Sequence, residues 1–150
     1  MIPDLKPTEG VFEGKTFYLP VRMYWEDTDT GGVVYHGNYV SYFERARTEM
    51  LRAAGLPHSD MMMGEDPTIW VISKVEIGYK RSAYMDDEVV VTAVVEKLGG
   101  ASMIMAQEMW RGDELLAEAR FRIAVTDKNG KPKRLPKKLF DKMKTLLLDA

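Results

Sequence analysis

The sequence predicts an α+β domain in which one long helix covers one face of an antiparallel sheet. A strand-like segment comes first, an amphipathic helix follows it, and four further strand-like segments come after the helix. Most of the later strands are joined by tight turns, and strands joined in this way pair antiparallel. Because a sheet with one apolar face must bury that face against another layer, the helix is expected to cover it. We therefore expect five strands, one long helix and a second helix at the C-terminus.

The bulk properties of the chain are those of one globular domain. Of its 150 residues, 45% are hydrophobic and 29% are charged, and we expect a single domain over residues 1–150 with its core at about residues 16–127. The 21 basic and 23 acidic residues leave no basic excess for non-specific nucleic-acid binding. There is no cysteine, which excludes disulfides, thiolate metal sites and cysteine nucleophiles. Because neither a signal peptide nor a membrane span is evident, we expect a cytoplasmic protein.

A change in the spacing of apolar residues separates the first strand from the long helix. Residues 16–25 (TFYLPVRMYW) are aromatic and branched and predict a strand, with Pro20 marking an edge or a bulge. Apolar residues then recur every three or four positions, as on one face of a helix. They are Tyr39, Tyr42, Phe43, Ala46, Met50, Leu51 and Ala54. Asn38 is the candidate N-cap, and Gly55 is the candidate glycine that ends the helix. The charged residues expected to face solvent are Glu44, Arg45, Arg47, Glu49 and Arg52.

Four strands are expected after the helix, at residues 68–79, 87–97, 101–111 and 115–126. Glycine-bearing turns at Gly99-Gly100 and Gly112-Asp113 separate the last three of them. Residues 1–14 are expected to be a loose lead-in and residues 56–67 a loop. A basic amphipathic pattern over residues 137–148 predicts the closing helix.

The densest polar cluster lies between the first strand and the long helix. The segment WEDTDTGGVVYHGNY, residues 25–39, holds three acidic residues, three glycines and a histidine just before the helix start. A helix N-terminus presents free N–H groups and a partial positive charge, which can stabilise an oxyanion. A carboxylate beside it can attack a carbonyl or deprotonate a water. The alternative is a capped loop, in which Asp27, Thr28 and Asp29 bond to their own backbone.

Other chemistries fit this segment poorly. A calcium loop that starts at Asp27 would place Gly31 at position five and Asn38 at position twelve, where oxygen ligands and a glutamate are needed. His36 and His58 are the only histidines and there is no cysteine, so only a carboxylate-rich metal site is left open. No serine lies in a G-x-S-x-G setting, and no phosphate-binding glycine loop follows a strand.

Two segments resemble a known family. Residues 21–55, VRMYWEDTDTGGVVYHGNYVSYFERARTEMLRAAG, closely resemble the opening of the 4-hydroxybenzoyl-CoA thioesterase-like hotdog family, and most of all its branch found with the bacterial Tol-Pal cell-envelope system. Residues 75–91, VEIGYKRSAYMDDEVVV, resemble the second characteristic segment of that family. The resemblance covers about residues 19–135. It implies the hotdog fold, in which an antiparallel sheet wraps around one long helix.

The resemblance also implies an acyl-CoA thioesterase that uses neither a metal nor an organic cofactor. The essential carboxylate of the family falls on Asp29, which would act as a nucleophile or as a general base on water. The backbone N–H of His36, beside Gly37 at the helix N-terminus, would polarise the thioester carbonyl. The His36 side chain is counted among the active-site residues of the related branch, although it would otherwise cap or pack near the helix start. Trp25 stands where a tyrosine is usual, which puts any role for that phenol in doubt, and Ser82 replaces a usual proline.

The same resemblance supplies expectations about substrate and partners. Phosphates of CoA need cations and polar groups, although surface solvation explains basic side chains equally well. The candidate contacts are Tyr35, Asn38, Lys74, Lys80, Arg81 and Ser102. The expected substrate is an acyl-CoA, with an acyl carrier protein as a second acyl donor. The expected lining of an acyl tunnel includes Tyr42, Met50, Met61, Met62, Met63 and Trp70. Members of the family work as dimers or tetramers with the site between subunits, so we expect a homodimer or homotetramer.

Two other functions stay open at this point. One is an enoyl-CoA hydratase on the same fold, although that class resembles D-x-N-P-x-H, with a separation of five, and Asp29 and His36 are seven residues apart. The other is a non-catalytic module that binds acyl-CoA or acyl carrier protein, which would keep the CoA groove without needing Asp29.

Overall fold

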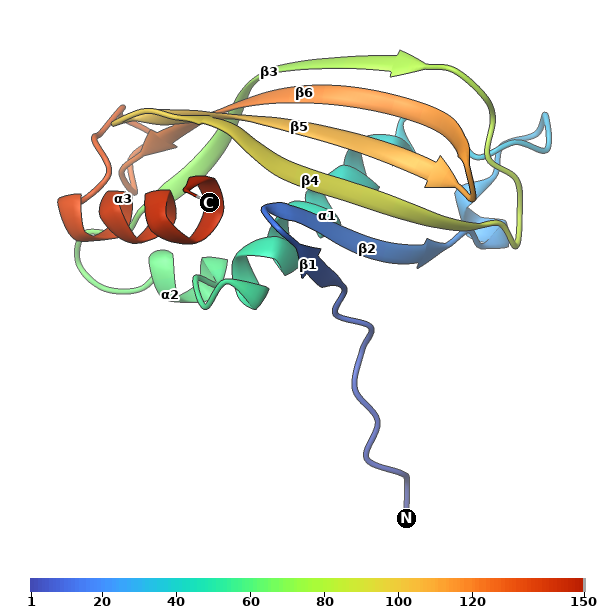
Figure 1. Cartoon of the computed structure of the whole chain (residues 1–150), viewed down its shortest axis with the longest axis horizontal. Helices are drawn as coiled ribbons and strands as arrows, with labels where there is room; N and C mark the ends of the chain where they lie inside the picture. Colours follow the sequence, from blue (N-terminus) through green and yellow to red (C-terminus); the bar gives the residue numbers. More distant parts are fainter. Residues whose placement is uncertain (150) are drawn as a thin grey trace.

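Six strands form one antiparallel sheet in the order β1-β2-β4-β5-β6-β3 (Figure 1). The computed structural model describes residues 1–149. The strands are β1 Val11–Glu13, β2 Thr16–Arg22, β3 Ile69–Tyr79, β4 Glu88–Leu98, β5 Ser102–Arg111 and β6 Glu114–Thr126. The predicted α+β class and the antiparallel sheet are confirmed, and the predicted number of five strands is corrected to six.

The additional strand lies in residues 1–14, where a loose lead-in is predicted. Val11–Glu13 pairs antiparallel with the start of β2. Gly14, between the two strands, has a φ of 60°, a left-handed backbone that glycine adopts without strain and that suits a hairpin turn. β1 pairs only with residues 16–18 of β2, so at Pro20 one side of β2 has no neighbouring strand. Pro20 therefore occupies the edge position that the sequence predicts.

The long helix α1, Asn38–Ala53, ends as predicted. Gly55 has a φ of 80°, which lets the chain leave the helix through a left-handed residue. The next N–H, that of Leu56, donates to the carbonyl of Leu51 at 2.8 Å. These two features are those of a Schellman motif, which satisfies carbonyls that the helix end would leave unpaired.

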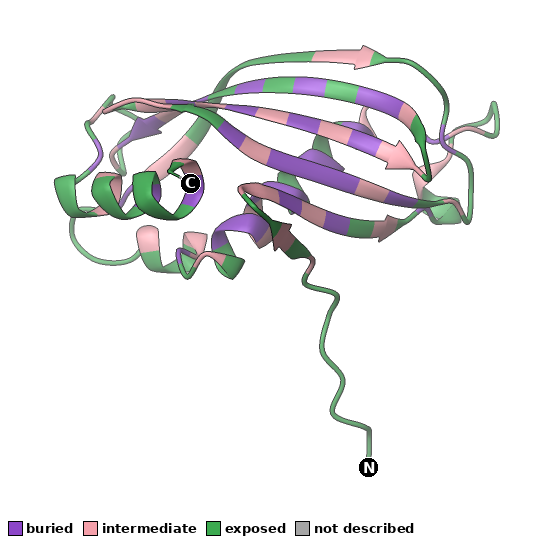
Figure 2. Cartoon of the chain, in the orientation of Figure 1, coloured by how far each residue is buried: buried purple, intermediate pink, exposed green. Residues whose placement is uncertain are grey.

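The apolar stripe of α1 packs against the inner face of the sheet. Tyr42, Phe43, Ala46 and Met50 are all 2% exposed or less, and Figure 2 shows buried and less buried residues alternating along the central strands. Alternate side chains of a strand point to opposite faces, so one face forms the core. The predicted C-terminal helix is present as α3, Lys137–Met143, and continues as the π-helical turn η2, Lys144–Leu148. A short helix α2, His58–Met61, interrupts the loop predicted at residues 56–67.

Arg47 on α1 corrects the predicted solvent-facing set, because its side chain is buried. Its Nη1 donates to Oε1 of Gln107 at 2.9 Å, and its guanidinium stacks on the Phe121 ring at 4.2 Å from the centroid. Gln107 in turn donates to the carbonyls of Phe43 and Thr92. A polar link therefore joins α1 to the middle of the sheet. Burial lowers the pKa of Arg47 to about 10.

Strand β3 forms an open edge of the sheet. It pairs only with β6, and most of its residues are exposed (Figure 2). The large apolar side chains exposed along it are Val71, Ile72, Val75 and Tyr79. Such a long apolar edge presents unpaired N–H and C=O groups and is a template for pairing with another strand.

The Tyr42 hydroxyl is the buried side-chain polar group without a hydrogen-bond partner within residues 1–149. Burial, followed by the nearby Asp27 carboxylate, raises the pKa of this phenol. A buried polar group without a partner costs roughly 1–3 kcal/mol. Tyr39, three residues earlier on α1, provides the contrast, because its hydroxyl accepts a hydrogen bond from the N–H of Ala83 at 3.2 Å.

We therefore expect Tyr42→Phe to leave the free energy of unfolding unchanged or to raise it by about 1 kcal/mol. Tyr39→Phe, the matched control, should lower it by about 0.5–1.5 kcal/mol because it leaves the Ala83 N–H unpaired. Urea denaturation of the three proteins measures both effects. An equal loss in the two variants would mean that the Tyr42 hydroxyl does have a stabilising partner.

Candidate active site

The loop between β2 and α1 is held together by Asp27. A 3-10 turn, η1 Trp25–Asp27, follows β2. The carboxylate of Asp27 accepts a hydrogen bond from the N–H of Tyr24 at 2.7 Å, and its carbonyl accepts from the N–H of Tyr35 at 2.9 Å. The same carbonyl accepts from Nδ2 of Asn38 at 2.8 Å. The two ends of the loop are thereby tied to one residue. The Thr28 hydroxyl and the Asp29 carboxylate also bond to nearby backbone, so the capped-loop geometry is present at all three residues named for it.

Asn38 begins α1 but does not cap it. Gly37 is the N-cap, and no side chain caps the helix. The prediction that Asn38 is the N-cap is therefore wrong, because its side chain is engaged with Asp27 instead. The first N–H groups of the helix are left without a side-chain partner.

Asp29 lies at a tight turn with its side chain exposed. Its N–H donates to the carbonyl of Val33 at 2.9 Å, and its Oδ1 accepts from the N–H of Gly31 at 2.8 Å. Gly32 completes the turn with a φ of 84°, a backbone that suits glycine. One carboxylate oxygen is thus fixed by the loop, while Oδ2 has no hydrogen bond within residues 1–149. The turn orients the carboxylate and leaves one oxygen available.

The start of α1 presents two open N–H groups at His36 and Gly37. Neither group donates to an acceptor within residues 1–149. The carbonyl of His36 accepts a hydrogen bond from the Tyr79 hydroxyl at 2.8 Å, and the His36 ring lies 4.6 Å from the Tyr35 ring, centroid to centroid. A Cβ at Gly37 would come within 2.6 Å of the Tyr35 ring, so glycine permits this packing. Oriented N–H groups at a helix N-terminus suit an anion or a developing negative charge.

A second loop, residues 80–87, packs against the candidate loop between β2 and α1. Val33 and Tyr84 form a β-bridge, and the N–H of Val34 donates to the carbonyl of Ala83 at 2.8 Å. The Tyr39 hydroxyl, on α1, accepts from the N–H of the same Ala83. Ala83 therefore joins the candidate loop and the helix start to the end of β3.

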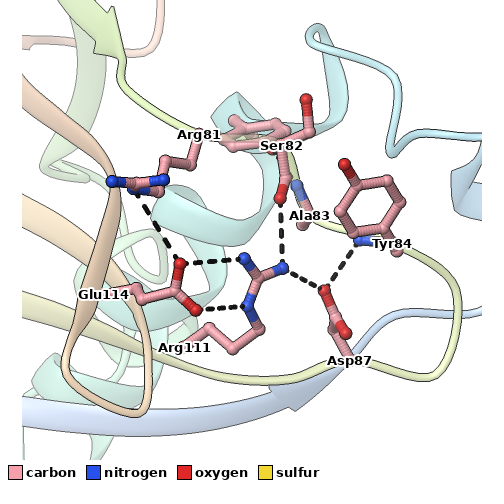
Figure 3. A network of polar contacts seen from close by, with 8 residues as sticks. Arg81, Ser82, Ala83, Tyr84, Asp87, Arg111 and Glu114 are labelled. Atoms are coloured by element: carbon pink, nitrogen blue, oxygen red, sulfur yellow. Dashed lines mark hydrogen bonds and ion pairs between the residues drawn. The ribbon is translucent and has the colours of Figure 1, made fainter.

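Arg111, at the end of β5, holds this second loop in place (Figure 3). Its Nη1 donates to the carbonyl of Ser82 at 3.1 Å and to Oδ2 of Asp87 at 2.6 Å. The Asp87 carboxylate also accepts from the N–H of Tyr84 at 2.8 Å. On its other side Arg111 pairs with Glu114. The hydrogen bonds and charges of Asp87 and Glu114 raise the pKa of Arg111, so the cation is retained.

The predicted substrate contacts are spread along the sheet. Lys80 and Arg81 follow β3 at the end of the sheet that carries the candidate loop, and they pair with Glu118 and Glu114 respectively. Lys74 lies in the middle of β3 and pairs with Glu76 at 3.0 Å.

Ser102 begins β5, whereas the second loop contacts Arg111 at the end of that strand. The length of β5 places Ser102 about 30 Å from Arg111, which contacts the second loop. Within one protomer the structure therefore groups Asp29, Tyr35, His36, Gly37 and Asn38 with Lys80 and Arg81, and it does not group them with Ser102.

Residues 1–149 contain neither a metal site nor a membrane-spanning helix. No group of three or more His, Asp or Glu side chains is placed to hold a metal ion. None of the helices in this range is long and apolar enough to cross a membrane.

Comparison with known proteins identifies the family of this chain. The model of the thioesterase superfamily matches residues 31–118, which is more than half of the chain. The chain belongs to the thioesterase superfamily. The match begins inside the candidate loop, at Gly31, and ends in β6. It therefore includes the open N–H groups of His36 and Gly37 and the supporting loop.

Relatives in the thioesterase superfamily match over most of their length. The acyl-CoA thioesterase YbgC of Haemophilus influenzae is 37% identical over 82% of this chain and 90% of its own. The acyl-CoA thioester hydrolase YbgC of an Escherichia coli strain is 36% identical over 85% of this chain and 96% of its own. The crystal structure of a probable thioesterase from Bartonella henselae superposes with a TM-score of 0.78 at 34% identity, covering 81% of this chain and 99% of that one. The predicted hotdog fold and family are confirmed.

Removing the Arg111 guanidinium should loosen both loops without unfolding the sheet. In Arg111→Met we expect the backbone amides of Val34 and Tyr84 to exchange with solvent about tenfold faster, because hydrogen bonds to charged groups are worth roughly 1.5–3 kcal/mol. Arg120→Met, which removes an exposed ion pair with Glu96, is the matched control. Hydrogen–deuterium exchange measures both. Unchanged protection in Arg111→Met would show that the loops do not depend on this arginine.

Proposed function

We propose that this protein hydrolyses acyl-CoA thioesters and that Asp29 is the essential carboxylate. The observation that carries the proposal is one loop that holds a free carboxylate oxygen on Asp29 and two open N–H groups at His36 and Gly37. Its relatives from Haemophilus influenzae and Escherichia coli, whose names state acyl-CoA thioester hydrolysis, support the substrate class.

The chemistry follows from these groups. The thioester carbonyl oxygen accepts hydrogen bonds from the N–H groups of His36 and Gly37, and the partial positive charge of the α1 N-terminus stabilises the oxyanion that forms. Asp29 then acts in one of two ways. As a nucleophile it attacks the carbonyl carbon, expels the CoA thiolate, which takes up a proton, and forms an anhydride that water hydrolyses. As a general base it takes a proton from the water that attacks the same carbon, the C–S bond then breaks, and the CoA thiolate that leaves takes up that proton.

The groups around the loop suit the rest of the substrate. Lys80 and Arg81 lie at the same end of the sheet and are exposed, so we propose that they meet the phosphates of CoA, where cations are needed. Tyr35 and Asn38 flank the two N–H groups and complete the proposed binding face. An acyl carrier protein as acyl donor and a cytoplasmic location stay predictions.

We further propose that the protein works as a homodimer, paired through β3. The exposed apolar edge of β3 is long enough for strand pairing, and two copies would bury Ile72 and Val75. Such a pairing would bring residues of a second copy close to the Tyr79 end of β3, which contacts His36. A site completed between subunits is consistent with this placement, and a dimer of such dimers gives the tetramer.

Asp29→Asn should lower kcat at least about 100-fold, because it removes the nucleophile or general base. The asparagine Oδ1 can still accept the hydrogen bond from Gly31, so the loop should keep its shape. Asp60→Asn, which replaces an exposed aspartate on α2, is the matched control and should leave kcat unchanged. Thiol release from a panel of aromatic, short-chain and long-chain acyl-CoAs measures the rate.

Undiminished thiol release in a folded Asp29→Asn protein would contradict the proposal that Asp29 is the essential carboxylate. Stoichiometric acyl-CoA binding without any thiol release by the unmodified protein would favour the non-catalytic module instead. Hydration of crotonyl-CoA would favour the hydratase.

Replacing Ile72 and Val75 with lysine should convert the dimer to a monomer, because it places repelling charges on the proposed pairing edge. Val11→Lys, an exposed apolar residue on β1 at the opposite edge of the sheet, is the control and should leave the mass unchanged. Size-exclusion chromatography with light scattering gives the masses. A monomeric unmodified protein, or a dimer that survives both lysines, would contradict pairing through β3.

A further inference from the structure

A cavity separate from the candidate active site lies between α1, α2 and the inner side of the sheet. Its volume is about 360 Å³, which falls within the range of small-ligand pockets. Most of its wall is apolar and includes Leu51, Trp70, Met103, Ile123 and Ile72, the last of which also lies on the proposed pairing edge of β3. None of the residues that form the candidate loop lines it.

Arg47 supplies a cation to this mostly apolar cavity. The residue is 6% exposed, and it lines the cavity. Within residues 1–149 no carboxylate lies within ion-pair distance of its guanidinium, and its hydrogen bond to Gln107 uses Nη1 alone. An arginine has five N–H donors in a planar fork, so Nε and Nη2 keep donors for a further acceptor.

Burying a cation without an anion is costly, and the surroundings of Arg47 compensate for only part of that cost. The Gln107 carbonyl oxygen accepts one hydrogen bond, and the Phe121 ring contacts the guanidinium face. Burial lowers the pKa of Arg47, although not far enough to remove its charge at neutral pH. A carboxylate inside the cavity would complete the pairing, because the guanidinium fork matches two carboxylate oxygens.

Three other residues with polar side chains line the same cavity, Glu44 and Thr48 on α1 and His58 on α2. His58 lines the cavity, and burial followed by the charge of Arg47 lowers its pKa, so it is neutral at pH 7 and can donate a hydrogen bond. Glu44 also lines the cavity, and its negative charge opposes an incoming anion. It is exposed, so solvent screens its charge more than that of Arg47.

We propose that this cavity binds an apolar carboxylic acid, with the carboxylate on Arg47 and the apolar part against Leu51, Trp70 and Ile123. Binding of a free acid does not depend on the proposed thioesterase activity, whereas binding of the far end of an acyl group rests on it. Arg47 lies eleven residues along α1 from His36, which corresponds to about 16 Å. The ligand is therefore either a free acid or the far, carboxylated end of a long acyl group whose thioester lies at the candidate loop.

Octanoate and 1-octanol are matched probes, because they share a chain and differ in the carboxylate. Isothermal titration calorimetry of the full chain should show saturable binding of octanoate that is tighter than that of octanol. Arg47→Met should weaken octanoate binding about tenfold or more, the loss expected for a charge-assisted hydrogen bond, and leave octanol binding unchanged. Arg45→Met, which replaces an exposed arginine on the same helix, is the control and should change the affinity for neither octanoate nor octanol.

Met62→Trp provides a variant that keeps Arg47 and fills the cavity from its exposed rim. It should abolish binding of both probes while the thermal unfolding curve stays the same. The proposal is overturned if octanoate does not bind the unmodified protein saturably, or if Arg47→Met weakens both probes equally. It is also overturned if octanoate still binds to folded Met62→Trp.

Two further measurements distinguish a free acid from the carboxylated end of an acyl group. A preference for the CoA thioester of a dicarboxylic acid long enough to span about 16 Å over the monocarboxylic thioester of equal chain length, lost in Arg47→Met, identifies the far end of the acyl group. Octanoate binding that leaves the hydrolysis of both thioesters unchanged identifies a free-acid site. Octanoate binding by a protein that hydrolyses no thioester would still support this cavity while contradicting the proposed function.

Discussion

The hydrogen bonds that converge on Asp27 are the constraint on which the candidate site depends. This one residue ties the exit of β2 to the start of α1, through Tyr24, Tyr35 and Asn38. Because both ends of the loop are fixed, the turn at Asp29 has a defined place relative to the first N–H groups of the helix. Chemistry at a carbonyl needs that relation to be held before substrate arrives, since orientation is a large part of the barrier.

The rest of the fold reinforces this loop from a distance. Arg111 and Asp87 hold the segment that carries Ala83, and Ala83 contacts both Val34 and Tyr39. Charged hydrogen bonds at the sheet end thus act on the site through backbone contacts, without touching substrate. The packing of the apolar stripe of α1 against the sheet is a second support for the loop, because the start of the helix keeps its position only if the rest of the helix does.

Much of the fold can be predicted from local patterns in the sequence. The end of α1 at Gly55 follows from glycine chemistry, and the five longer strands follow from branched residues and turns. The candidate site residues Asp29, His36 and Gly37 come from the family resemblance of one contiguous segment, residues 21–55. The support from Ala83 was not evident, since no local pattern reports which distant loop lies behind the site. The predicted exposure of Arg47 rests on its charge and is wrong, because its position four residues after Phe43 places it on the buried stripe.

The open edge of β3 has a consequence for how the chain behaves in a crowded solution. Any strand that pairs with this edge lowers the free energy of the folded state, so apparent stability rises with protein concentration by mass action. A freshly folded chain exposes an eleven-residue edge strand to any other strand that it meets. The edge that favours assembly is therefore also the place where misassembly would begin.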